Sequence, residues 1–119
     1  MSRANHAIAF AGSTVEWAQD ELELSAEEIA RTVGANRKTV ARWRDGASAP
    51  STEHRKHLER LNQLRYFLET SFRSFDAARK WLHSPAPGLQ GRTPIFALTE
   101  GDMDSVLKLL GTLAAGGFR

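Results

Sequence analysis

Apolar residues recur every three or four positions along most of the chain, which is the spacing of one face of a helix. The most informative stretch is 25–46, SAEEIARTVGANRKTVARWRDG. Ser25 and Glu28 have the spacing of a capping box, which predicts that a helix begins there. Gly34 suits the left-handed conformation that ends a helix, and Asn36 can cap a second one. Two short helices across a tight glycine turn predict a helix-turn-helix.

The second of these helices has one apolar face and one cationic face. Val40 and Trp43 are expected to pack inward, so that the basic side chains point outward. Cations on a short helix suit the major groove of DNA, because phosphates attract them and Arg or Lys can bond guanine edges. The alternative is a basic helix that is only solvated. The residues expected to contact DNA are Arg37, Lys38, Thr39, Arg42 and Arg44, with Arg55 and Lys56 of the next helix beside the groove.

The remaining pattern predicts an all-α fold, in which a long helix continues the helix-turn-helix into a second helical module. Residues 1–12 are weakly patterned and are expected to form a flexible tail. Ser13 and Glu16 repeat the capping-box spacing and predict the start of a first helix. A long helix is expected over 52–72. The expected organisation is a tail at 1–12, a helix-turn-helix module at 13–51 and a helical domain at 52–119.

Short helices separated by capping residues are expected in the C-terminal half. Ser74 can cap a helix over 75–82. Thr93 followed by Pro94 predicts a cap and a first-turn proline. Asp102 can cap the last helix, whose apolar positions form one continuous face.

Charge is distributed unevenly, although the net charge of the 119 residues is only +2. Residues 1–35 contain two basic and six acidic side chains, whereas residues 36–60 contain seven basic and three acidic ones. Positive charge therefore gathers at the second helix of the predicted helix-turn-helix, which we call the reading helix, and just after it. This is expected of a local nucleic-acid footprint.

Several classes of protein are disfavoured by composition. The chain has no cysteine and no apolar run of membrane-spanning length, so we expect a cytoplasmic protein with no membrane partner. His54 and His57 share a helix face, but no ligand set accompanies them, and neither a metal nor a cofactor is expected. No nucleophile set or phosphate-binding loop can be assembled, so no catalytic residue is named and an enzyme is not expected.

The C-terminal half resembles the toxin-binding domain of the Xre/MbcA/ParS family of antitoxins, whose members place a helix-turn-helix in front of that domain. The Gly-x-Thr-Pro step and the upstream Trp-Leu are the most specific part of the pattern. The matching residues are Trp81-Leu82, Pro85, Gly91-x-Thr93-Pro94, Leu98, Gly101, Val106, Leu110 and Gly117-Phe118.

The resemblance implies a partner and a site. The partner would be a RES-domain toxin that consumes NAD, and the antitoxin would cover its active-site cleft with its C-terminal end near the opening. Simple packing is the alternative for Trp81, and Phe118 could instead fold back as a helix-capping contact. The residues that the resemblance assigns to toxin binding are Trp81, Ser84, Pro85, Arg92, Thr93, Pro94, Gly117, Phe118 and Arg119.

We therefore expect an antitoxin of a type II toxin–antitoxin pair that also regulates its own operon by binding a double-stranded DNA operator. One helix-turn-helix contacts only a half-site, so a homodimer or a toxin-bridged higher oligomer is expected. The alternatives are a stand-alone transcriptional regulator whose C-terminal half only dimerises, and an adaptor whose basic helix touches no DNA.

Overall fold

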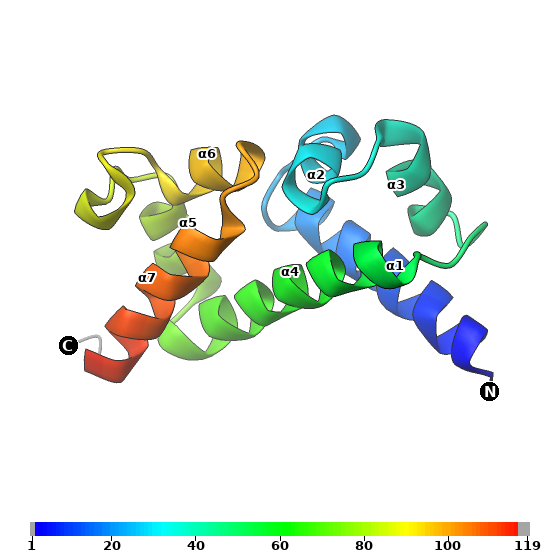
Figure 1. Cartoon of the computed structure of the whole chain (residues 1–119). Coiled ribbons are helices and arrows are strands. Elements are labelled where there is room, and N and C mark those ends of the chain that lie inside the picture. The colour runs from blue at the N-terminus through cyan, green and yellow to red at the C-terminus, as the bar shows by residue number, and fades with distance from the viewer. Residues whose placement is uncertain (1, 117–119) are drawn as a thin grey trace. The chain divides into compact units, whose positions relative to one another are not determined.

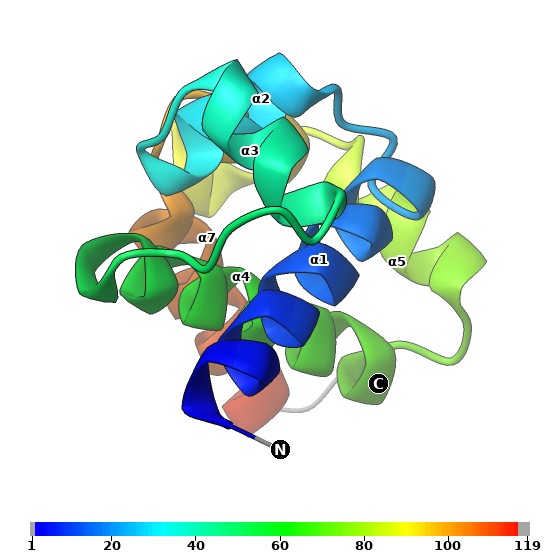
Figure 2. The same cartoon turned by 90° about the vertical axis from the view of Figure 1, so that its right-hand side faces the viewer.

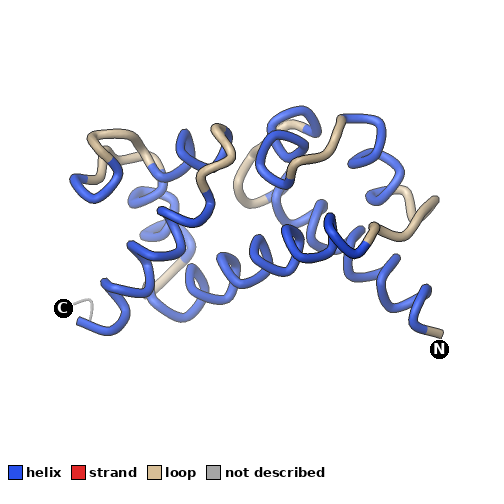
Figure 3. The backbone as a smooth tube through the Cα atoms, viewed as in Figure 1, coloured by secondary structure: helices blue, strands red, loops and turns tan. Residues whose placement is uncertain are grey.

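The computed structural model describes residues 2–116, and this part of the chain contains helices and loops but no strand (Figures 1 and 3). The predicted all-α fold class is confirmed. The elements are α1 (Arg3–Asp20), α2 (Ala26–Val33), α3 (Arg37–Arg44), α4 (Thr52–Ser71), α5 (Phe75–Leu82), the 3₁₀ helix η1 (Pro87–Leu89), α6 (Pro94–Thr99) and α7 (Met103–Gly116). None of the described helices is both long enough and apolar enough to cross a bilayer.

The chain divides into two compact units, Met1–Leu61 and Asn62–Arg119, and the division falls inside α4. From the sequence we expected the division between residues 51 and 52, just before this helix. The first turns of α4 go with the N-terminal unit because His54 packs edge-on against the ring of Trp43 in α3, with 5.2 Å between the ring centroids. Nearby Leu58 is fully buried.

The first helix starts earlier than the sequence predicted. We expected a flexible tail at 1–12 and a helix start at Ser13. Both predictions are wrong, because residues 3–12 already belong to α1 and Ser13 lies inside that helix. The hydroxyl of Ser2 caps the helix by accepting a hydrogen bond from the Asn5 N–H at 3.2 Å. Ala11 is fully buried, and at Gly12 the helix comes so close to α3 that an added Cβ would lie 3.2 Å from the Trp43 carbonyl. Packing therefore holds these residues in the helix.

The α2–α3 pair forms as its capping residues predicted. Ser25 accepts a hydrogen bond from the Glu28 N–H at 3.1 Å, and the Glu28 carboxylate accepts one from the Ser25 N–H at 3.0 Å. Gly34 ends α2 with φ of +71°, a conformation that costs other residues free energy. Asn36 then caps α3 by accepting from the Thr39 N–H at 2.8 Å.

The second unit is built from short helices that bury one face each. The predicted caps are confirmed: Ser74 accepts from the Ala77 N–H, and Thr93 accepts from the Phe96 N–H at the start of α6. Pro94 occupies the first turn of α6, where its missing N–H costs nothing. The core of this unit is formed by Leu64, Leu68, Ala78, Leu82, Leu89, Leu98, Val106 and Leu110.

Candidate functional site

The outer face of α3 is the first candidate site. Val40 and Trp43 are 0% and 1% exposed, which confirms the predicted inward face of this helix. All four of its basic side chains are exposed, and Thr39 is half-buried. The helix therefore presents a cationic surface on a rigid apolar support. The exposed basic residues are Arg37, Lys38, Arg42 and Arg44.

These cations are available to a partner. Arg44 contacts the Asp45 carboxylate at 3.3 Å, but both side chains are largely exposed, and such surface pairs contribute at most about 1 kcal/mol. Within residues 2–116, no ion pair is formed by Arg37, Lys38 or Arg42. A polyanion can therefore bind this face without first breaking strong internal contacts.

Arg55 and Lys56, which we expected beside the DNA groove, are exposed on the first turns of α4. Arg55 makes a loose contact with Glu59, with 3.7 Å between the nitrogen and the carboxylate oxygen. His54 and His57 make separate contacts, because His54 packs on Trp43 and His57 lies 3.8 Å from Glu53. In the described residues, no group of three His, Cys, Asp or Glu side chains could hold a metal ion.

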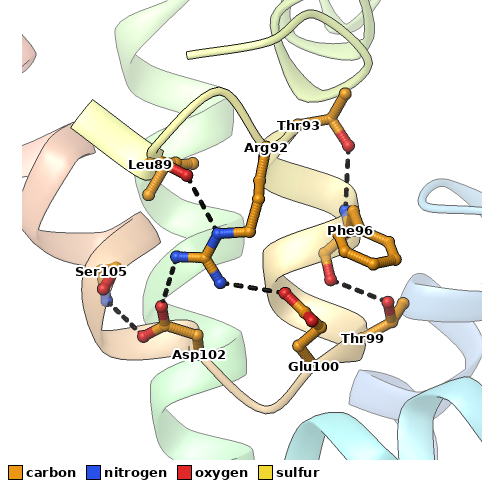
Figure 4. A network of polar contacts seen from close by, with 8 residues as sticks. All are labelled: Leu89, Arg92, Thr93, Phe96, Thr99, Glu100, Asp102 and Ser105. Atoms are coloured by element: carbon orange, nitrogen blue, oxygen red, sulfur yellow. Dashed lines mark hydrogen bonds and ion pairs between the residues drawn. The ribbon is translucent and has the colours of Figure 1, made fainter. Parts of the chain in front are cut away.

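The second candidate site surrounds the loop that connects η1 to α6, and Arg92 is its centre (Figure 4). Arg92 Nε donates a hydrogen bond to the Leu89 carbonyl at 2.9 Å. Its two terminal nitrogens donate to the carboxylates of Glu100 at 3.0 Å and Asp102 at 2.8 Å. The Asp102 carboxylate also accepts from the Ser105 N–H at the start of α7. Arg92 therefore ties the loop to the turn between α6 and α7.

This geometry shifts the pKa values of the paired groups. The hydrogen bonds from Arg92 and Ser105 hold the pKa of Asp102 below its ordinary value of 3.8. The hydrogen bonds to Asp102 and Glu100 raise the pKa of Arg92 further above its already high ordinary value. Arg92 is thus charged throughout the physiological range and held in one orientation.

The lowered pKa of Asp102 predicts a stability loss in acid. The Arg92–Asp102 pair contributes fully to the free energy of unfolding at pH values above 3.8, the ordinary pKa of the carboxyl. This contribution is lost as the pH falls through the lower pKa of Asp102 in the folded state. We expect Asp102→Asn to be less stable than the parent chain near neutral pH, and this difference to shrink as the pH falls below 3.8. Urea unfolding followed by circular dichroism across the acidic range measures the difference. The matched control is Asp76→Asn, at a side chain that is 86% exposed. A difference that stays constant into strong acid would contradict the assignment.

The structure places the other residues expected to bind the toxin in three different ways. Ser84 and Pro85 are exposed, and the Ser84 hydroxyl donates a hydrogen bond to the Lys80 carbonyl at 2.6 Å. The Trp81 ring is half-buried and packs at 5.8 Å from the ring of Phe72. Thr93 caps α6 and Pro94 is buried, so both support the loop from within. Gly117, Phe118 and Arg119 lie outside the described residues.

Phe96 is a candidate contact residue that our sequence reasoning missed. It lies on α6 and is 53% exposed, and among the described residues only Tyr66, at 63%, is also a large apolar side chain with an exposed surface. Its backbone is fixed at both ends, because its N–H donates to Thr93 and its carbonyl accepts from the Thr99 hydroxyl (Figure 4). The available signal was helical spacing: Ala97 and Leu98 are buried, and Phe96 lies off their face.

Comparison with known proteins gives a consistent match. The model of the family described as "Antitoxin Xre/MbcA/ParS C-terminal toxin-binding domain" matches residues 68–116. The mycobacterial cidal antitoxin MbcA of Mycobacterium bovis is 33% identical over 108 residues, which cover 89% of this chain and 93% of the relative. The MbcA of Mycobacterium tuberculosis matches equally.

A solved structure supports the same match. The crystal structure of the M. tuberculosis MbcT-MbcA toxin-antitoxin complex contains a chain that aligns with a TM-score of 0.60 and 31% identity. The alignment covers 91% of this chain and 96% of that one.

Proposed function

Because this chain belongs to the Xre/MbcA/ParS family of antitoxins, we propose that it binds and blocks a RES-type, NAD-consuming toxin and represses its own operon. The observation that carries the proposal is the match of residues 68–116 to a toxin-binding domain. These residues lie wholly within the second compact unit, and the cationic face of α3 lies in the first. The two activities would therefore reside on separate parts of one chain.

The toxin-binding surface would include the exposed residues next to the Arg92 network. Arg92 joins the loop, α6 and α7 through hydrogen bonds, so this region is ordered before a partner arrives. A surface that is already ordered loses less conformational entropy on binding. Ser84, Pro85 and Phe96 offer it exposed polar and apolar atoms, and the C-terminal residues 117–119 stay part of the proposed site.

Co-expression with the product of the neighbouring gene tests the toxin half of the proposal. The gene product alone should deplete cellular NAD and arrest growth, and the two chains together should co-purify and leave NAD unchanged. A neighbour that forms no complex with this chain, or that leaves cellular NAD unchanged when it is expressed alone, would reject the proposed toxin class.

Operator binding is the second half of the proposal. The exposed cations of α3, three of which form no ion pair within residues 2–116, support it, because phosphate neutralisation by Lys and Arg supplies most of the affinity of such proteins for DNA. One α3 would read one half-site, so a dimer, or a toxin-bridged oligomer, would be the binding species. Repression would then depend on the amount of antitoxin and toxin present.

Arg42→Ala tests whether α3 reads the operator. If Arg42 bonds a base edge, we expect the variant to lose about 1–3 kcal/mol of operator affinity and part of its sequence preference. Fluorescence anisotropy on the promoter fragment and on a scrambled duplex measures both effects.

Arg73→Ala is the matched control for this experiment. It removes the same charge at an exposed position of the second unit and should leave the affinity for DNA nearly unchanged. Equal losses of operator affinity for the two variants would show that Arg42 acts only through its charge and does not bond a base edge. No operator binding by the parent chain would reject the DNA half of the proposal.

A further inference from the structure

We propose that Arg3, His6 and Arg55 form a phosphate-binding cleft that holds the DNA backbone beside the duplex segment contacted by α3. The inference rests on the proposed operator binding and adds α1 to the DNA-binding surface. It concerns residues that lie before the α2–α3 pair and just after it, outside the reading helix itself.

The cleft lies between the first turns of α1 and α4. It is open to solvent and has a volume of about 490 Å³. Its lining carries basic and polar groups together with the apolar side chains of Ala7 and Phe10 from α1. The lining residues are Arg3, His6, Ala7, Phe10, Arg55 and Glu59.

The charge of the lining suits a phosphate. Arg3 and Arg55 are cations on opposite walls, and Glu59 is the one acidic residue of the lining. The Arg55–Glu59 contact is 3.7 Å long between side chains that are 51% and 61% exposed, so a phosphate oxygen can replace the carboxylate at little cost. Arg3 is exposed and makes no ion pair within the described part of the chain. His6 adds an exposed imidazole N–H that can donate to a phosphate oxygen.

Both walls of the cleft are anchored to the C-terminal end of α3. On the α4 side, His54 immediately precedes Arg55 in the chain and packs on the ring of Trp43. On the α1 side, Ile8 lies beside Gly46, and Gly12 approaches the carbonyls of Trp43 and Arg44. All these residues belong to the first compact unit, so the cleft and α3 move together.

The arrangement matches how DNA-binding proteins divide their contacts. Figure 2 shows the loop between α3 and α4 crossing below α3, with the first turns of α1 further down in the view. A helix in the major groove is flanked by the two phosphate backbones, and contacts to these phosphates set the register of the helix on the duplex. The cleft is rigidly attached to the reading helix and carries two cations. A backbone phosphodiester is therefore the ligand that it fits.

The test uses the full chain and measures how affinity depends on salt. For Arg3→Ala we expect the slope of log affinity against log salt concentration to fall by about one, because one phosphate contact is lost. The affinity should fall by a similar factor, several-fold, on the operator and on a scrambled duplex, because a phosphate contact carries no base information. Arg55→Ala should behave in the same way.

The controls separate this inference from the proposed function. Arg73→Ala removes one exposed arginine from the second unit and should leave the salt slope unchanged. If Arg42→Ala lowers operator affinity while Arg3→Ala matches Arg73→Ala, the cleft is rejected and operator reading by α3 stands. If the parent chain binds no DNA, both proposals fail.

The source of the phosphate is tested separately. Inorganic phosphate and a mononucleotide are titrated against the full chain, and amide shifts are followed by NMR. Weak, non-saturating shifts at Arg3, His6 and Arg55, together with the reduced salt slope, support a backbone phosphate. Saturable binding of either small anion, with a salt slope that Arg3→Ala leaves unchanged, would instead assign the cleft to a free anion and overturn the inference.

Discussion

Trp43→Ala is expected to lower the free energy of unfolding by about 3–5 kcal/mol, as truncation of a fully buried large side chain does. Trp43 is 1% exposed and packs against His54, so its removal leaves a cavity between α3 and α4. Because α3 loses its support, operator binding is expected to disappear together with stability. Urea unfolding followed by far-ultraviolet circular dichroism measures the first effect, and anisotropy with the promoter fragment measures the second.

Two variants make this prediction specific. Trp43→Phe keeps an aromatic ring at the site and should lose clearly less stability. Phe96→Ala truncates an aromatic side chain that is 53% exposed and should change stability by only about 0.5 kcal/mol or less. If Trp43→Ala left the unfolding midpoint where the parent chain has it, the bracing of α3 by this ring would be rejected.

Phe96→Ala is expected to weaken the binding of the toxin strongly. An exposed aromatic side chain on an ordered surface is typical of a binding hot spot, and its truncation costs about 2 kcal/mol or more, which is roughly thirtyfold in Kd. We therefore expect isothermal titration calorimetry with the purified toxin to give a Kd at least that much weaker. Operator binding should be retained, because Phe96 lies outside the first unit.

Tyr66→Ala is the matched control for the toxin complex. Tyr66 is also an aromatic residue of the second unit and is 63% exposed, but it lies on α4, outside the region around the Arg92 network. A similar loss for the two variants would show that exposed aromatic area in general, and not the α6 position, binds the partner. An unchanged Kd for Phe96→Ala would remove α6 from the proposed interface.

Helix starts could be predicted wherever a short sequence signal decides them. Ser25, Asn36, Ser74 and Thr93 all cap helices as their spacing indicated, because a cap depends only on residues two or three positions away. Ser13 carries the same signal, yet it lies inside α1. There the packing of α1 on α3 decides, and local spacing contains no information about such contacts.

The candidate sites show the same division between local and distant contacts. The inward face of α3 could be predicted because Val40 and Trp43 follow helical periodicity. Arg92 was predicted as a residue that binds the toxin, but its partners Glu100 and Asp102 lie eight and ten positions further along the chain. Only the folded loop brings these groups together, so its internal role had no sequence signal.

The continuity of α4 across the division of the chain has a consequence for the lifetime of the protein in the cell. A helix is a cooperative structure, and ending one in its middle requires new unsatisfied backbone groups and loses the hydrogen bonds of the adjoining turns. Melting of either unit therefore destabilises the turns of α4 that serve the other. Proteolysis that begins in one half would be transmitted to the second, so that the proposed operator-binding and toxin-binding surfaces would be lost together when the chain is degraded.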